Sequence, residues 1–127
     1  MNKDITFHPI GFVRNTFSST SHGEQMRAGK SQIILDPDLV AGLQGLVMGQ
    51  QVMVLFFFDR VDGFVLLQHP RGDHTQPKRG VFALRSPRRP NPIGVTVVEL
   101  LSIDGDVLTV RGMDAFDGTP VLDLKPA

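Results

Sequence analysis

Residues 85–94 read "RSPRRPNPIG" and separate two apolar runs, "GVFAL" before them and "VTVVELL" after them. Pro90 and Pro92 flank Asn91 and bias it away from helical backbone angles, and each proline also fixes its own φ angle. The stretch therefore predicts a stiff loop between two strands. Such a loop, with its three arginines, is either a solvated connection or a preorganised holder of an anionic or planar ligand.

The rest of the chain has the same organisation, with short apolar runs separated by turn residues. The β-rich runs predict strands at residues 5–13, 32–35, 51–58, 64–68, 80–84, 93–103, 107–113 and 121–124. Asp104-Gly105 predicts a hairpin turn. One helix is predicted at residues 36–46, with Asp36 as N-cap and Pro37 at its first position, and residues 14–31 read as a long polar loop. Because helical patterns do not alternate with the strands, we predict a mainly β fold: a small single-domain β-barrel with one short helix, covering residues 1–127.

Composition and missing motifs exclude several functions. The chain has no cysteine, which excludes disulfides and thiolate chemistry. No apolar run approaches the roughly 18 residues that span a bilayer, and no secretory signal opens the chain, so we expect a cytoplasmic protein without a membrane partner. The four histidines match no common ligand spacing, and we expect no metal. Without G-x-G-x-x-G or G-x-S-x-G, neither a Rossmann site nor a nucleophile elbow is predicted.

Two loops are candidates for binding. Residues 69–91 hold six Lys and Arg residues and one Asp, a net charge of +5, whereas the other residues sum to −5. This asymmetry favours a local anion site, although a solvated basic loop is the alternative. The second loop contains the turn Asp117-Gly118-Thr119-Pro120. It either holds a polar ligand or is an ordinary turn in which Asp117 caps its own backbone.

Two segments in order, "GVFALRSPRRPNPIGVTVVELL" (80–101) and "DGTPVLDLKP" (117–126), closely resemble the TsaA-like (TrmO) family. "IGFVR" near the start and "VMVLFFF" upstream extend the resemblance over most of the chain. The resemblance implies a small β-barrel that binds S-adenosylmethionine and methylates N6 of threonylcarbamoyladenosine, next to the anticodon of tRNA. It also implies a homodimer.

The resemblance further implies roles for individual residues. The family usually has a histidine and a polar residue after the aromatic strand, and this sequence has Asp59 and Arg60 there. The family also tends to have a Pro-Arg-Gln contact in the N-terminal loop, to which residues 25–27 are only an approximate match. The expected cofactor contacts are Arg85, Val97, Asp117, Gly118, Thr119, Pro120, Asp59 and Arg60. The catalytic residue stays unassigned, with Asp117, Asp59 and His69 as candidate proton acceptors. The expected contacts to RNA phosphates are Arg71, Lys78, Arg88 and Arg89.

One departure leaves alternatives open. Many family members continue into a further C-terminal segment implicated in holding tRNA, whereas this sequence ends at Ala127. The alternatives are the same cofactor fold acting on a small molecule or another RNA, and a barrel that binds nucleotide or RNA without catalysis.

The apolar run at residues 52–58 predicts how the chain assembles. Seven consecutive apolar residues require cover on both faces of a strand, and a barrel interior covers only one. The 36–46 helix contains two glycines and gives little cover. We therefore predict a two-fold homodimer with the strand at 51–58 near the interface, and with the partner's loop 14–31 completing the site.

Overall fold

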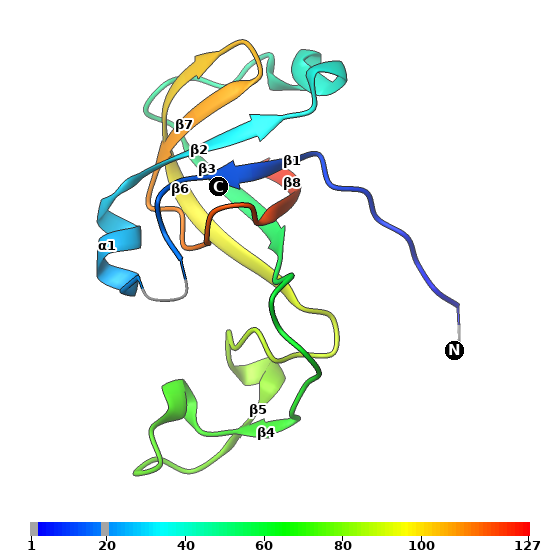
Figure 1. Cartoon of the computed structure of the whole chain (residues 1–127), viewed down its shortest axis with the longest axis vertical. Helices are drawn as coiled ribbons and strands as arrows, with labels where there is room; N and C mark the ends of the chain where they lie inside the picture. Colours follow the sequence, from blue (N-terminus) through cyan, green and yellow to red (C-terminus); the bar gives the residue numbers. More distant parts are fainter. Residues whose placement is uncertain (1–2, 19–20) are drawn as a thin grey trace.

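Six antiparallel strands close into a barrel in the computed structural model, which describes residues 3–18 and 21–127 (Figure 1). Around the barrel the order is β1-β2-β7-β6-β3-β8, and β8 pairs with β1 to close it. The prediction of a small, mainly β barrel is confirmed. The strands are β1 (Gly11–Arg14), β2 (Lys30–Leu35), β3 (Gln51–Phe57), β6 (Ile93–Asp104), β7 (Val107–Arg111) and β8 (Pro120–Pro126).

Alternating side chains fill the barrel interior. In β3, Val52, Val54 and Phe56 are buried, because successive residues of a strand point to opposite faces. In β6 the corresponding inward residues include Val98 and Leu100, which is fully buried. The interior is therefore a packed core, so a ligand site must lie at one end of the barrel or on its outer surface.

The predicted hairpin and the predicted helix both form, with small shifts. β6 and β7 pair from Asp104 and Val107 inward, so the two turn residues are Gly105 and Asp106, one position later than predicted. The helix is a 3-10 helix, Pro37–Leu43, and the Asp36 carboxylate accepts a hydrogen bond from the Asp38 amide at 3.0 Å, as an N-cap does. It is shorter than the predicted 36–46.

The polar segment 14–31 does not remain a loop throughout, and that prediction is wrong in its second half. Residues Gly23–Ala28 form the α-helix α1. The helix has six residues and only Met26 is buried, so the sequence shows no apolar period that could reveal it. The predicted opening strand 5–13 is also shorter than expected, since only β1 forms and residues 3–9 are exposed outside regular structure.

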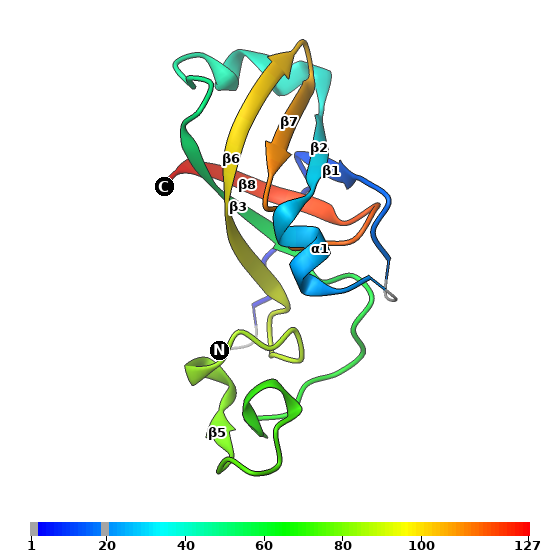
Figure 2. The same cartoon turned by 90° about the vertical axis from the view of Figure 1, so that its left-hand side faces the viewer.

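Residues 59–92, which we call the lobe, leave the barrel between β3 and β6 and lie beyond one of its ends (Figures 1 and 2). The predicted strands at 64–68 and 80–84 are largely wrong. Only the two-residue strands β4 and β5 form, and they pair with each other and not with the barrel. The elements of the lobe are β4 (Leu67–Gln68), the 3-10 turns Pro70–Gly72 and Val81–Ala83, and β5 (Arg79–Gly80).

In the described part of the chain, no helix is both long enough and apolar enough to cross a membrane.

Candidate functional site

A pocket of about 750 Å³ opens where β3 ends, β6 begins and the lobe joins the barrel. Its volume lies in the range of about 300–1,000 Å³ that small-molecule sites occupy. Helix α1 and the segment between β7 and β8 complete its walls. The lining residues are Ser21, Gly23, Met26, Arg27, Phe56, Phe58, Asp59, Arg60, Val61, Leu84, Arg85, Pro87, Arg89, Ile93, Gly94, Val95, Thr96, Asp114, Ala115, Phe116 and Thr119.

The junction of lobe and barrel depends on one glycine. The rings of Phe56 and Phe58 meet edge to face, with centroids 5.0 Å apart. A Cβ atom on Gly94 would lie 2.5 Å from the Phe56 ring and 2.8 Å from the Phe58 ring. Next to it, the Phe58 amide donates to the Pro92 carbonyl at 2.8 Å, which joins the two ends of the lobe. The sequence Pro-Ile-Gly therefore lets β6 approach the aromatic end of β3.

The arginine-rich loop is braced by its own side chains. The Arg89 guanidinium donates to the carbonyls of Leu84 at 2.9 Å and Ser86 at 3.1 Å. The Ser86 hydroxyl accepts a hydrogen bond from the Arg88 amide at 3.2 Å. Arg85 differs, because in the described part of the chain it has no hydrogen-bond or ion-pair partner while it lines the pocket. The loop thus presents one available guanidinium to the pocket.

The turn at residues 116–119 is held on one side by β1 and the residues after it. Gly118 has a φ angle of +85°, which glycine adopts without strain, and its amide donates to the Val13 carbonyl at 2.7 Å. The Asp117 carboxylate accepts from the Asn15 amide at 3.0 Å. Thr119 is buried, and its hydroxyl donates to the Phe116 carbonyl at 2.7 Å. The Asp117 carboxylate is therefore used to hold the turn.

Charged groups of both signs border the pocket. The cations are Arg27, Arg60, Arg85 and Arg89, and the carboxylates are Asp59 and Asp114. Apolar side chains from β3, β6 and α1 lie between them. Such a lining suits a ligand that carries both charges and also has an apolar or aromatic part.

Four of the predicted cofactor contacts line the pocket and four do not. Arg85, Asp59, Arg60 and Thr119 line it. Val97 lies farther along β6, 46% exposed on the outer face of the barrel. The residues outside the lining are Val97, Asp117, Gly118 and Pro120.

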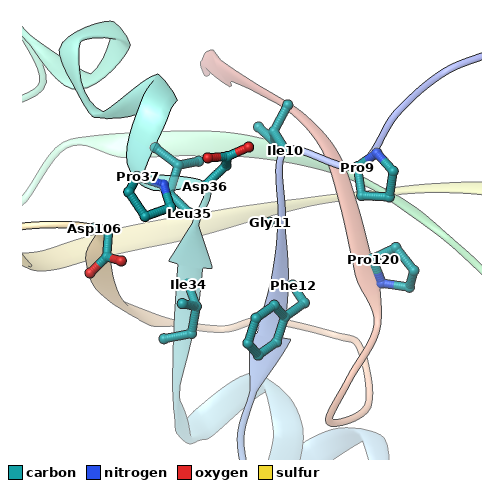
Figure 3. Close-up of a pocket in the computed structure, with 10 residues that line it drawn as sticks. All are labelled: Pro9, Ile10, Gly11, Phe12, Ile34, Leu35, Asp36, Pro37, Asp106 and Pro120. Carbon is teal, nitrogen blue, oxygen red and sulfur yellow. The ribbon is translucent and has the colours of Figure 1, made fainter.

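Pro120 borders a different depression on the barrel. Figure 3 shows it beside Phe12 and Ile34, on three neighbouring strands. The walls of this depression are largely apolar, with the carboxylates of Asp36 and Asp106 at one end. The Asp36 carboxylate already caps the 3-10 helix, so the depression offers little polar chemistry for a ligand.

His69 lies in the lobe, away from the pocket lining. Its ring contacts that of His74, with centroids 4.2 Å apart and the planes tilted by 47°, and its Nδ1 atom lies 2.9 Å from the Gln76 carbonyl oxygen. Of the predicted RNA contacts, Arg71, Lys78 and Arg88 are exposed on the lobe, whereas Arg89 is half-buried and bonded within its own loop. Among residues 3–18 and 21–127, no cluster of three or more His, Cys, Asp or Glu side chains could hold a metal ion.

One contributor to the pocket, Asp114, is not predictable from the sequence motifs, and two more come from residues 25–27, which match the family only approximately. Met26 and Arg27 come from helix α1, in a segment predicted as loop, so this chain's own N-terminal segment borders its own pocket. Asp114 carries no motif of its own. Its place in the sequence could have indicated it, because Asp114 lies two residues before turn 116–119.

Comparison with known proteins points to one group. A model of the tRNA-methyltransferase O N-terminal domain matches residues 13–127. A protein of Archaeoglobus fulgidus, named a probable S-adenosyl-L-methionine-binding protein, is 41% identical over 125 residues, which is 96% of this chain and 34% of that protein. A mouse protein named tRNA (adenine(37)-N6)-methyltransferase is 34% identical over 136 residues, which is 97% of this chain and 31% of that protein.

A solved structure of the same family also resembles this chain. The crystal structure of TrmO from P. aeruginosa superimposes with a TM-score of 0.77 at 31% identity, over 100% of this chain and 56% of that one. The chain thus spans about a third of the two curated relatives, at 34% and 31%, and about half of the solved chain, at 56%.

Proposed function

The chain belongs to the family of the tRNA-methyltransferase O N-terminal domain, and from this premise we propose that it is an S-adenosylmethionine-dependent tRNA methyltransferase. Its substrate is an adenosine next to the anticodon, methylated on N6, and the finer assignment is threonylcarbamoyladenosine. We also propose that it acts in the cytoplasm. The relatives' names support the cofactor and the methyl acceptor.

The observation that carries the proposal is the available Arg85 guanidinium at a pocket with apolar walls. S-adenosylmethionine combines a carboxylate, a cationic sulfonium and a planar adenine. Arg85 suits the carboxylate, because a guanidinium fork binds two oxygens at once. Asp59 and Asp114 offer negative charge for the cationic groups, and Phe58 belongs to the apolar wall available for the adenine. The residues present therefore fit the cofactor.

Positioning supplies most of the catalysis in this proposal. When bound, the cofactor supplies an electrophilic methyl group, and the protein must hold the acceptor nitrogen in line with it. The N6 nitrogen must also lose a proton. Of the three candidate acceptors, only Asp59 borders the pocket, since Asp117 accepts from the Asn15 amide and His69 lies in the lobe. We assign the proton to Asp59 on this geometry.

The lobe provides the surface for RNA. Arg71, Lys78 and Arg88 are exposed there, within the segment of net charge +5. Such groups contact phosphates and orient the nucleic acid without reading its sequence. Arg89 contributes indirectly, because it braces the loop that carries Arg88.

The outer surface of β3 and β6 supports a homodimer. Three apolar pairs lie side by side there: Met53 with Val97, Leu55 with Val95, and Phe57 with Ile93. We call these six residues the outer patch; Phe57 is 38% exposed and Val97 46%. The patch runs into the pocket, because Val95 and Ile93 belong to both. A second copy bound to the outer patch would lie against the cofactor site. This favours a two-fold interface in which the outer patches of the two subunits face each other.

Sedimentation equilibrium tests the interface. We expect a dimer at micromolar concentration, and Phe57→Glu should shift it to monomer because a charge would be buried against an apolar partner. Phe12→Glu is the matched control, since Phe12 is also exposed on the outside of the barrel but lies on β1. A monomeric native protein, or a dimeric Phe57→Glu protein, contradicts the assignment.

Mass spectrometry of tRNA nucleosides tests the function. The protein, S-adenosylmethionine and tRNA that carries threonylcarbamoyladenosine should give a methylated nucleoside. Arg85→Ala should weaken cofactor binding by about 1.5–3 kcal/mol, whereas Arg79→Ala, an exposed lobe arginine outside the pocket, should not. Cofactor binding without transfer to any RNA would favour a binding barrel, and transfer to another acceptor would correct the substrate.

A further inference from the structure

Arg60 links the start of the lobe to the turn that borders the pocket. Its guanidinium donates a hydrogen bond to the carbonyl of Asp117, at the centre of turn 116–119. Its Cζ atom also lies 5.6 Å from the centroid of the Phe116 ring, in a cation–π arrangement. Arg60 is the second residue of the lobe, so this contact crosses from the lobe to the barrel. Its guanidinium is thus engaged by the protein itself.

The opposite side of the same turn is fixed by the barrel. The amides of Asp117 and Gly118 donate to the carbonyls of Phe17 at 3.0 Å and Val13 at 2.7 Å. These bonds hold the turn toward β1 and the residues after it, whereas Arg60 holds it from the side of the lobe. The turn is therefore fixed between the N-terminal segment of the barrel and one guanidinium.

We propose that Arg60 is a positioning residue, which holds turn 116–119 in the shape that binds the cofactor without itself contacting the cofactor. The inference rests on the proposed function and refines the role that the family resemblance implied for Arg60. Arginine suits this task because its planar group can stack on a ring and donate in the same plane, whereas lysine has a single point charge. Phe116 and Thr119, the two residues of the turn that line the pocket, carry the effect to the site.

Hydrogen exchange of the cofactor-free protein tests the positioning directly. In Arg60→Ala, the amides of Asp117, Gly118 and Thr119 should exchange about tenfold faster, because one side of the turn no longer has its charged donor. Amides of the β6–β7 pairing should keep their native rates. Arg79→Ala is the control, since it removes an exposed charge from the same lobe. Unchanged exchange in the turn would overturn the proposal.

Binding of S-adenosylhomocysteine, measured by calorimetry, tests the consequence. Arg60→Ala should bind about tenfold more weakly, Arg60→Lys should fall between it and the native protein, and guanidinium added in excess, below denaturing concentration, should restore part of the affinity of Arg60→Ala. A turn that loosens with no change in affinity, or a weakening that guanidinium does not reverse, would overturn the role in binding. If the native protein binds no cofactor, the proposed function fails, while the exchange experiment still decides whether Arg60 positions the turn.

Discussion

The barrel and the lobe contain similar apolar runs and use them in opposite ways. The run at residues 52–58 becomes β3, where Phe56 is 2% exposed, whereas in the run at 64–67 Leu67 is 60% exposed. β3 has neighbouring strands on both sides, while β4 pairs only with two residues of β5. An apolar run thus becomes a buried strand only where other strands cover it. We therefore expect the barrel to supply most of the stability, while the proposed RNA contacts lie on the exposed lobe.

The largest expected effect tests where the stability resides. Leu100→Ala in the barrel should lower the free energy of unfolding by about 2–5 kcal/mol, because it leaves a cavity in a packed core. Leu67→Ala in the lobe should change it by about 0.5 kcal/mol or less. Urea titration of both variants gives the comparison. Equal decreases would mean that the lobe belongs to the same cooperative core.

A smaller effect is expected at the junction of the two regions. Gly94→Ala places a methyl group 2.5 Å from the Phe56 ring, and overpacking of this kind costs about 1–3 kcal/mol. Gly80→Ala is the control, since a Cβ atom there would meet nothing within 4 Å. Thermal unfolding measures both. If the two variants are equally stable, the aromatic packing at this junction is looser than the structure shows.

The third prediction concerns the charges of the lobe. Replacing Arg71 and Lys78 by alanine should leave unfolding unchanged and weaken RNA binding, with the salt slope falling by about 0.7–0.9 for each phosphate that no longer has a cationic partner. Filter binding of tRNA between low and moderate salt measures the slope. Lys3→Ala removes an exposed charge far along the chain from the lobe and serves as control. An unchanged slope would make this basic segment a solvated loop.

The smallest expected effect is a pH response within the lobe. Hydrogen bonds from the Thr75 hydroxyl at 2.6 Å and the Thr75 amide at 3.0 Å hold the pKa of Asp73 below its ordinary value. Because the pKa of Asp73 is lower in the folded state than in the unfolded state, its ionised form stabilises the fold. This stabilisation is fully present above the ordinary Asp pKa of about 3.9 and is lost as the pH falls through the folded pKa. NMR titration of the Thr75 amide should show that midpoint. Asp73→Asn should abolish it, and a midpoint at or above the ordinary value would contradict the assignment.

The sequence predicted the parts of the fold that local patterns determine. The β-rich apolar runs that become β3 and β6, and the Asp104-Gly105 turn signal before Val107, were sufficient to predict the barrel and its hairpin. The lobe was predicted poorly, because its apolar residues lack the strand neighbours that would make them strands. Helix α1 is six residues long and carries one buried side chain, which is too little for a period to be visible.

The candidate site divides in the same way. Arg85 and Asp59 were expected at the site from the family resemblance, and both line the pocket. The engagement of Arg60 by Asp117 could not be predicted, because it joins residues 57 positions apart through a turn whose shape depends on β1. Arg89 likewise looked like a free RNA contact in the sequence, and only the structure shows its two carbonyl partners.

The hydrogen bond between the Phe58 amide and the Pro92 carbonyl has a consequence for how this fold can diversify. β3 and β6 pair as the two strands of a β-hairpin, and the lobe is the segment that connects them. The barrel therefore holds the two ends of the lobe together, however many residues the lobe contains. The entropy of closing a flexible loop rises only slowly with its length, so inserts of different size can join β3 to β6 at little cost. An engineer could therefore exchange residues 59–92 as a cassette and test whether RNA binding, which we propose for the lobe, changes with it. Since Asp59, Arg60 and Arg85 all belong to that cassette, each exchange would have to keep the carboxylate and both guanidinium groups.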